Sequence, residues 1–173
     1  MQLTFNLHNY KYFPYENSLA HQEIEALFGQ RPSLHEVGLF IRAGHKWETL
    51  ALRTTYFKEV SAENGKNIIP LQALLEASAN GGLHELKPGI YLTPNLKRQS
   101  TRYSAHGLHE YRGKFNPQLV RVIGNLLGLR ANSWVLDPFC GSGTTLLESA
   151  HIGWNALGLD INPLAVEIAR AKL

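Results

Sequence analysis

The stretch of this sequence with the clearest chemical potential is DPFCGSGTT, which spans Asp137 to Thr145. A carboxylate ends a short apolar run, and two glycines, Gly141 and Gly143, follow within a few residues. Glycine permits positive φ and lets another group approach the backbone without a Cβ in the way. We therefore expect this turn to make close contact with a cofactor.

Three kinds of nucleotide site can be compared with this turn. A phosphate-binding P-loop needs Gly-Lys-Ser/Thr at the start of the helix, and no lysine is present here. A dinucleotide-binding turn needs a third glycine, where this chain has Leu146. Asp137 would also repel a pyrophosphate. A carboxylate at this position instead suits S-adenosylmethionine, because that cofactor carries an ammonium and a sulfonium group.

Asp160 is a second acid with a promising position. It ends the next expected strand, 23 residues after Asp137 (160 − 137). An acid there can accept hydrogen bonds from ribose hydroxyls, as in folds that bind NAD, and Ile161 would then lie against the adenine. The alternative is that Asp160 caps the helix that begins near Asn162.

The elements around the turn follow the order helix, strand, helix, strand, helix. The two strands are SWVLDPF, expected to be buried, and NALGLDI. The helix between them runs over residues 144–152 and is stopped by Gly153. Asn162 and Pro163 begin the last helix. This order predicts the opening of a doubly wound parallel α/β sheet, whose ligands lie beyond the carboxyl ends of the strands.

The first helix of this series begins with the same cap. Asn116 can cap it, Pro117 occupies its first position, and Gly128 ends it. We expect its apolar stripe to face the core. The stripe consists of Leu119, Val120, Ile123, Leu126 and Leu127.

The first 96 residues predict a small α+β region. Ser18 is expected to cap a helix that Gly29 stops. Residues 37–43 and 47–60 are rich in β-branched and aromatic types, and the spacer 44–46 would join them as a hairpin. A further helix fits residues 71–77.

Composition places the chain among soluble proteins of a reducing compartment, and we expect a cytoplasmic location. Hydrophobic residues make up 44% of the 173 residues, which is enough for a core. The start shows no signal-peptide pattern, and no apolar run approaches the length that crosses a bilayer. Cys140 is the one cysteine, so no internal disulfide can form. Packing is a better role for it than nucleophilic catalysis.

Positive charge is concentrated in one part of the chain. Residues 97–130 hold 7 Lys/Arg against 1 Asp/Glu, with aromatic residues between the charges. This pattern favours contact with a nucleic acid, and the alternative is a solvated linker. The expected nucleic-acid contacts are Lys97, Arg98, Arg102 and Arg112.

DPFCGSGTT resembles the first motif of the DNA methyltransferases that modify an exocyclic amine, N4 of cytosine or N6 of adenine. HEYRGKFNPQLV (residues 109–120) resembles the segment that these enzymes place before that motif. The resemblance covers roughly residues 104–173. RNA methyltransferases with a similar turn are the nearest alternative. The resemblance and the chemistry of the turn together imply a site for S-adenosylmethionine. The residues expected to bind it are Lys114, Phe115, Asp137, Pro138, Phe139, Cys140, Gly141, Ser142, Gly143, Thr144, Asp160 and Ile161.

The resemblance also implies an incomplete enzyme. The family holds the target base in a loop with adjacent prolines followed by Tyr or Phe, and none of the eight prolines here is next to another. We expect residues 1–96 to form the α+β region, 97–116 a basic linker beside the cofactor, and 117–173 the start of a Rossmann-like methyltransferase domain. Such a chain would transfer no methyl group alone. The alternatives are a fragment, a truncated gene product, one piece of a split enzyme whose second chain carries the rest of the domain, or a non-catalytic nucleic-acid-binding remnant.

Other residues are assigned lesser roles. Glu148 either steadies the cofactor loop or faces solvent. His106 and His109 are expected in a linker or at a nucleic acid rather than at a metal, because no cysteines provide zinc spacing. Trp134 and Trp154 are expected to pack at strand starts. No catalytic residue and no metal ligand are predicted.

Overall fold

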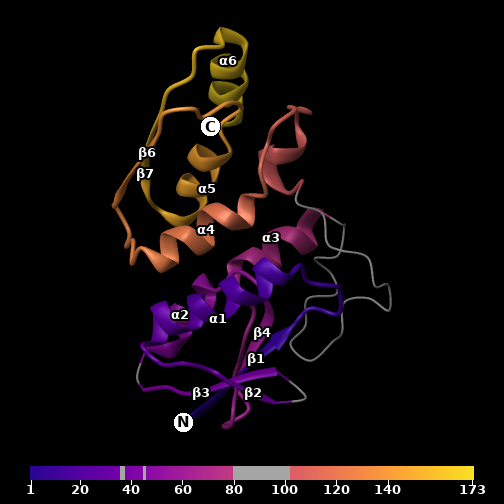
Figure 1. The fold of residues 1–173 in the computed structure, drawn as a ribbon, viewed down its shortest axis with the longest axis vertical. Helices are drawn as coiled ribbons and strands as arrows, with labels where there is room; N and C mark the ends of the chain where they lie inside the picture. The colour runs from indigo at the N-terminus through magenta and orange to yellow at the C-terminus, as the bar shows by residue number, and fades with distance from the viewer. Residues whose placement is uncertain (36–37, 45, 80–101) are drawn as a thin grey trace.

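The structure is a computed structural model that describes residues 1–35, 38–44, 46–79 and 102–173. It is a mixed α/β protein with two sheets, one of five strands and one of two. Helices α1, α3 and α4 lie between the two sheets, with the parallel pair β6–β7 on the far side of α4 from the five-stranded sheet (Figure 1). The chain therefore places the glycine turn far from its N-terminus.

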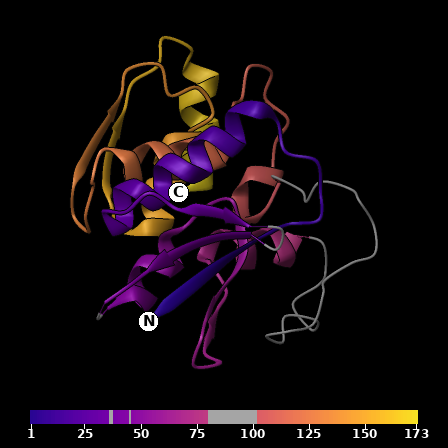
Figure 2. The same cartoon turned by 60° about the horizontal axis from the view of Figure 1, so that its bottom comes forward.

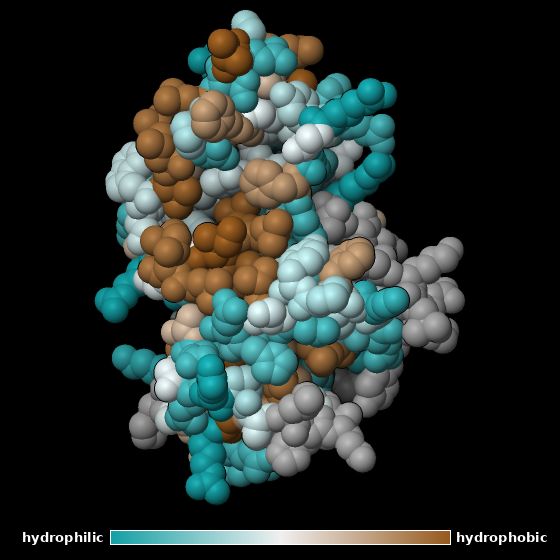
Figure 3. Space-filling model, in the orientation of Figure 1, coloured by the Kyte–Doolittle hydropathy of each residue, from teal (hydrophilic) through white to brown (hydrophobic). Residues whose placement is uncertain are grey.

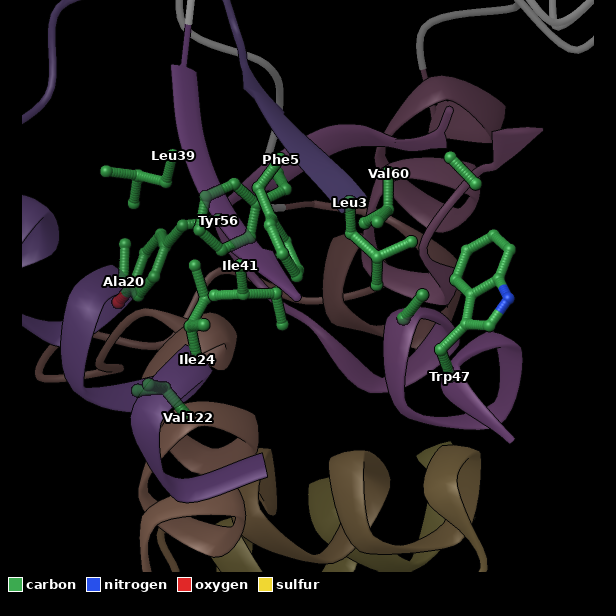
Figure 4. Close-up of a cluster of buried hydrophobic side chains, with 13 residues drawn as sticks. Leu3, Phe5, Ala20, Ile24, Leu39, Ile41, Trp47, Tyr56, Val60 and Val122 are labelled. Atoms are coloured by element: carbon green, nitrogen blue, oxygen red, sulfur yellow. The ribbon is translucent and has the colours of Figure 1, made fainter. Parts of the chain in front are cut away.

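The five-stranded sheet is antiparallel, in the order β2-β3-β1-β4-β5. Its central strand β1 alternates buried Leu3 and Phe5 with less buried residues, which is the pattern of a strand with one face on a core. Ala20 and Ile24 of α1 pack on that face together with Val122 of α4 (Figure 4). The strands span Gln2–Leu7 (β1), Ser33–His35 (β2), Gly38–Arg42 (β3), Phe57–Ala62 (β4) and Asn67–Ile68 (β5).

Helix α1, Pro14–Phe28, begins four residues before the cap predicted at Ser18. Proline occupies its first position, and the buried Glu16 side chain accepts a hydrogen bond from the Phe13 amide at 2.8 Å. These two features start the helix earlier than Ser18 would. The predicted stop at Gly29 is confirmed, since Gly29 has φ 68° and donates to the Glu25 carbonyl.

The hairpin predicted over residues 37–60 is wrong. Residues Trp47–Arg53 form a helix, α2, in which Trp47 and Ala51 are buried one turn apart. Strand β3 pairs with β1 and β2, whereas β4 pairs with β1 and β5. Aromatic and β-branched content suggested a strand, but the four-residue spacing of the buried side chains is helical. Helix α3, Leu71–Ala79, confirms the helix expected at 71–77.

The strands that flank the glycine turn form a parallel pair, as predicted. Strand β6, Trp134–Asp137, pairs with β7, Asn155–Gly158. Helix α5, Thr144–Ile152, connects them and ends at Gly153, whose φ is 76°. Helix α6, Pro163–Lys172, follows β7.

The two predicted asparagine caps are both present. The Asn116 side chain accepts from the Gln118 amide at 3.1 Å and opens α4, Pro117–Leu126. The Asn162 side chain accepts from the Leu164 amide at 3.0 Å and opens α6. A short 3-10 helix, η2, spans Ser104–Gly107 before α4.

Helix α4 buries only part of the stripe that its sequence suggests: Val120 is buried, and Leu119 and Leu126 pack against the core. Ile123 and Leu127 are 49% and 71% exposed, whereas Val122 is fully buried. The reason is that α4 contacts both α1 and α5, and the side chains that face those neighbours include polar ones. Those buried polar side chains are Gln118, Arg121 and Asn125.

Strand β6 is also more exposed than expected. Trp134 is 74% exposed, so its predicted packing role is wrong, whereas Trp154 is buried as predicted. Turned by 60°, the molecule shows α1 lying across the side of the five-stranded sheet that faces the α4–α6 helices (Figure 2). No helix in the described part of the chain is long and apolar enough to cross a membrane.

Candidate functional site

The glycine turn sits at the carboxyl ends of β6 and β7 and is held by backbone hydrogen bonds between the two strand ends. The Cys140 amide donates to the Leu159 carbonyl at 2.9 Å, and the Leu159 amide donates to the Asp137 carbonyl at 2.9 Å. The Asp160 carboxylate accepts from the Gly141 amide at 2.8 Å. These bonds bring the two predicted acids to the same edge of the sheet.

The two glycines of the turn have left-handed conformations, with φ 50° at Gly141 and 79° at Gly143. A Cβ at Gly141 would lie 3.1 Å from the ring of Tyr111, and a Cβ at Gly143 would lie 2.9 Å from the Cβ of Ala169. The close approaches that the structure shows are therefore to an aromatic ring and to α6. Tyr111 was not predicted at this site, although its place in the segment before α4 is the signal that could have indicated it.

The predicted cofactor residues divide into exposed and buried ones. Phe139 is 86% exposed and Ile161 is fully exposed, and Pro138 is exposed with them. Their side chains are accessible to a ligand beside Asp137 and Asp160, which are partly exposed. The others shape the turn from within: Cys140, Ser142, Gly143 and Thr144 are all buried.

Lys114 and Phe115 are placed differently from the turn residues. The ammonium of Lys114 donates to the carbonyl of His106 at 2.6 Å, so it holds η2. Phe115 is 42% exposed. From this segment of the chain, Tyr111 is the residue whose ring lies against Gly141.

Asp160 retains capacity for a ligand. Its two oxygens accept from the Gly141 amide and from the Asn162 amide, each at 2.8 Å. Asp160 is not the cap of α6, the alternative considered for it, because the side chain of Asn162 fills that role. A carboxylate oxygen can accept a second hydrogen bond, so ribose hydroxyls fit alongside the backbone amides. The residues present thus suit a cofactor with a ribose and, beside Asp137, a cationic group.

The surroundings of the Cys140 thiol favour a packing role over a nucleophilic one. Burial raises its pKa, and the nearby charges of Asp137 and Asp160 raise it further. A thiol with a raised pKa stays neutral, whereas a nucleophile must become a thiolate.

A second feature, which we call the Glu148 cluster, lies on α5 just after the turn. Glu148 is completely buried. Its carboxylate accepts hydrogen bonds from Tyr103 at 2.8 Å and from Arg121, and lies 2.7 Å from His106 Nε2. His151 completes the cluster, with Nδ1 3.4 Å from the same carboxylate. The cluster joins η2, α4 and α5.

Electrostatics fixes the charges in the Glu148 cluster. Burial acts to raise the pKa of Glu148, but hydrogen bonding to His106 and His151 and the charge of Arg121 outweigh it and hold the pKa below its usual range. Burial lowers the pKa of His106, which favours its neutral form. The cluster therefore contains a carboxylate–guanidinium pair with a neutral His106 beside it.

Burial excludes one of the two alternatives considered for Glu148, because its side chain does not face solvent. It also corrects the prediction for His106, which is 1% exposed and is not a linker or nucleic-acid contact. His106, Glu148 and His151 place potential metal-ligating atoms within 4.8 Å of one another. Arg121 already neutralises Glu148, however, so a divalent ion would leave two uncompensated positive charges in a buried place. We interpret the cluster as structural.

The predicted nucleic-acid residues are exposed where the structure describes them. Arg102 forms an ion pair with Glu110 at 2.7 Å, and both side chains are largely exposed. Arg112 and His109 are exposed in the same segment. Lys97 and Arg98 lie outside the described residues.

The parallel strand pair thus carries a glycine turn and two acids on its carboxyl edge. The family model described as DNA methylase, for N6 and N4 methyltransferases, matches residues 33–171. The chain belongs to this DNA methylase family.

Similar proteins include both DNA and tRNA enzymes. The chain is 40% identical over 77 residues to the type II methyltransferase M.MjaII of Methanocaldococcus jannaschii, covering 44% of this chain and 14% of that protein. It is 41% identical over 63 residues to a tRNA (guanine(10)-N2)-dimethyltransferase of Methanothermobacter thermautotrophicus, covering 36% and 19%. It is 39% identical over 62 residues to the type II methyltransferase M.BsoBI of Geobacillus stearothermophilus, covering 36% and 12%. These matches thus cover less than a fifth of each of these relatives.

Proposed function

We propose that this chain is the S-adenosylmethionine-binding part of an enzyme that methylates an exocyclic amine in DNA, N4 of cytosine or N6 of adenine. The observation that carries the proposal is the geometry at the carboxyl edge of β6 and β7, where Asp160 holds the Gly141 amide and Asp137 ends the neighbouring strand. Membership of the DNA methylase family supports the same activity.

The cofactor would be bound by side chains from both strand ends. Asp160 would accept hydrogen bonds from the ribose, while the exposed Ile161 would lie against the adenine. Asp137 would attract the cationic methionine end, and Tyr111 would border it across Gly141. The bound cofactor supplies the methyl group, and these residues orient it. We place this site in the opening of a Rossmann-like domain over residues 117–173, with 97–116 as a basic flanking segment and 1–96 as an α+β region.

RNA is the second candidate substrate. Its support is the similarity to a tRNA dimethyltransferase, which is as high as the similarity to the DNA enzymes. We favour DNA because the family match covers 139 residues (33 to 171), more than any of the pairwise matches above. The exposed Arg102 and Arg112 would contact the phosphate backbone of either substrate.

A partner polypeptide is part of the proposal. Leu136 and Leu157 are register partners on β6 and β7, and both are more than half exposed. Apolar side chains gather over these strands and over α4 on the face shown in Figure 3. Parallel strands are normally covered on both faces. We propose that a second chain with the rest of the methyltransferase domain covers this surface and supplies the base-binding loop.

That loop determines what the isolated chain can do. An amine in a base is a poor nucleophile, because its lone pair is delocalised into the ring. An acceptor and an aromatic surface must position it. No two prolines are adjacent in this sequence, so the family's Pro-Pro loop is absent from it. We therefore propose that this chain binds cofactor and transfers no methyl group alone.

Calorimetry and a transfer assay test this proposal together. The purified chain should bind S-adenosylmethionine, and Glu167→Ala, an exposed position on α6, should bind it equally well. With radiolabelled cofactor and mixed DNA and RNA, the chain alone should incorporate no label. A failure to bind the cofactor would overturn the binding assignment, whereas label transferred by the chain alone would overturn the need for a partner.

A further inference from the structure

A cavity of about 460 Å³ lies between the helices of the five-stranded sheet and those of the parallel pair. Helices α2 and α3 contribute Leu52 and Leu71 to its lining, and Ile152 and Trp154 line it from the end of α5 and the start of β7. This volume is within the range of pockets that bind small organic ligands. The apolar part of the lining suits the flat face of an organic ring system.

The charged residues that line this cavity are positive. They are Arg53, from α2, Arg121, from α4, and Arg130, from the loop before β6, and no carboxylate is among the described residues that line the cavity. Arg53 donates to two uncharged oxygens, those of Asn125 and the Leu129 carbonyl, at 2.8 and 2.6 Å. Because Arg121 is paired with Glu148, Arg53 and Arg130 are the guanidinium groups that give this apolar space its net positive charge, which favours an anion.

Arg121 adds a second observation. The residue is 3% exposed, and its Nε is bound to Glu148, yet its Nη2 has no hydrogen-bond partner among the described residues. Buried guanidinium nitrogens are normally satisfied. Arg121 also lines the cavity, so one of the lining residues carries a hydrogen-bond donor left unsatisfied by the described residues.

We propose that this cavity binds a nucleoside phosphate, either a free nucleotide or one nucleotide of a strand. The base would lie against Leu52, Ile152 and Trp154, and the phosphate would be held by the arginines, whose planar groups bind phosphate oxygens in pairs. The site is separate from the cofactor turn. Helix α5 has nine residues between them, which corresponds to about 13 Å of helix.

The test uses cytidine 5′-monophosphate, a probe without adenine, in calorimetry with the full chain and no S-adenosylmethionine. Cytidine and inorganic phosphate alone should each bind at least tenfold more weakly, because each lacks half of the recognised chemistry. A four-residue oligodeoxycytidine forms the second arm and distinguishes a nucleotide within a strand from a free one. Either arm would support the site if the variants below weaken it.

Two variants locate the binding. Arg130→Ala removes an exposed cation that makes no ion pair among the described residues, and it should lower the affinity for the probe at least fivefold. Leu52→Trp, at a residue 44% exposed, should fill the cavity and abolish binding. Arg170→Ala, on the surface of α6, is the matched control and should bind normally.

The proposal is overturned if both probes bind no better than inorganic phosphate, or if Arg130→Ala and Leu52→Trp bind them as the unmodified chain does. Should Leu52→Trp fail to fold by circular dichroism, Arg130→Ala against Arg170→Ala decides the matter. Because no cofactor is present, this result is independent of the proposed methyltransferase site.

Discussion

The carboxylate of Asp160 and the backbone amide of Gly141 are joined by a 2.8 Å hydrogen bond between the ends of two parallel strands. The bond fixes the glycine turn relative to β7, so the acid proposed to bind ribose also shapes the turn. Removing this side chain therefore affects both roles, and two substitutions are needed to separate them.

Asp160→Asn and Asp160→Ala should weaken S-adenosylmethionine binding to different extents. Alanine removes all the acceptors and should cost about 1.5–3 kcal/mol of binding free energy, as for hydrogen bonds to a charged group. Asparagine keeps one acceptor oxygen and should cost less. Calorimetry measures both, with Glu167→Ala as the control. Affinity unchanged in Asp160→Ala would remove this residue from the site.

Glu148→Gln should destabilise the fold strongly. The substitution leaves Arg121 as a buried charge without its counterion, which typically costs about 3–5 kcal/mol. Urea denaturation followed by circular dichroism would measure the change in unfolding free energy. Glu167→Gln breaks an exposed pair with Arg170 and should cost less than about 1 kcal/mol. Equal effects of the two substitutions would contradict the buried-pair interpretation.

Gly124→Ala should be destabilising because of Trp154. A Cβ at residue 124 would overlap the indole ring, with Cζ2 of Trp154 at 2.6 Å. Overpacking of this kind costs about 1–3 kcal/mol. In a Trp154→Leu background the same substitution should cost less than in the unmodified chain, because the ring is gone. Thermal unfolding of the four proteins forms the double-mutant cycle, and strict additivity would disprove the contact.

The stability of the fold should fall at acidic pH because of the buried His8. Burial lowers the pKa of His8 to about 4, and the charge of Lys58 contributes to the shift. The folded state then binds the proton more weakly than the unfolded state, whose pKa is about 6.5. The stabilisation is thus complete above pH 6.5 and is lost as the pH falls towards 4, a change on the order of 3 kcal/mol.

His8→Gln isolates this effect, because it removes the titrating group. The loss of stability between pH 6.5 and 4 should be smaller in His8→Gln than in the unmodified chain, whereas His21→Gln, at a partly exposed position on α1, should behave as the unmodified chain does. Glu23 also makes stability depend on pH, because burial raises its pKa to about 7 and its stabilising contribution is lost as the pH rises. This contribution is the same in His8→Gln and in the unmodified chain, so it cancels in the comparison. Parallel pH profiles for His8→Gln and the unmodified chain would contradict the prediction.

Nucleic-acid binding should depend on salt through Arg102 and Arg112. Each phosphate contact contributes about 0.7–0.9 to the slope of log affinity against log salt concentration. Replacing both arginines by alanine should therefore reduce the slope by about 1.5. Fluorescence anisotropy with a labelled oligonucleotide measures it, with the exposed Arg31→Ala as the control. A slope that does not change would identify the segment as a solvated linker.

Local signals predicted the elements around the turn well. In Asn116-Pro117 and Asn162-Pro163, an N-cap residue is followed directly by a proline at the first helical position, and Gly153 marks a helix end in the same local way. Their hydrogen bonds join residues two to four positions apart, so the sequence contains the whole interaction. The parallel pairing of β6 and β7 followed from the order of elements.

Non-local contacts could not be read in the same way. The Glu148 cluster depends on Tyr103, which is 45 residues away, so nothing near Glu148 in the sequence marks it as buried. The same holds for α4, where the exposure of Ile123 and the burial of Arg121 depend on which helices pack around it. Helix α2 was missed because residues 47–60 were treated as one stretch, although the strand-favouring types lie mostly after Arg53 and residues 47–53 are rich in helix formers.

Helix α4 meets the helices of the five-stranded sheet through directional bonds. Gln118 donates to Glu76 of α3 at 2.6 Å, and Asn125 donates to Glu23 of α1 at 2.7 Å. Such an interface constrains the exchange of modules between proteins. A chimera that joined residues 102–173 to an unrelated N-terminal region would leave these two amides buried without acceptors. A functional graft would have to carry both acids in the same geometry, so the two halves of this chain are expected to be inherited as one piece.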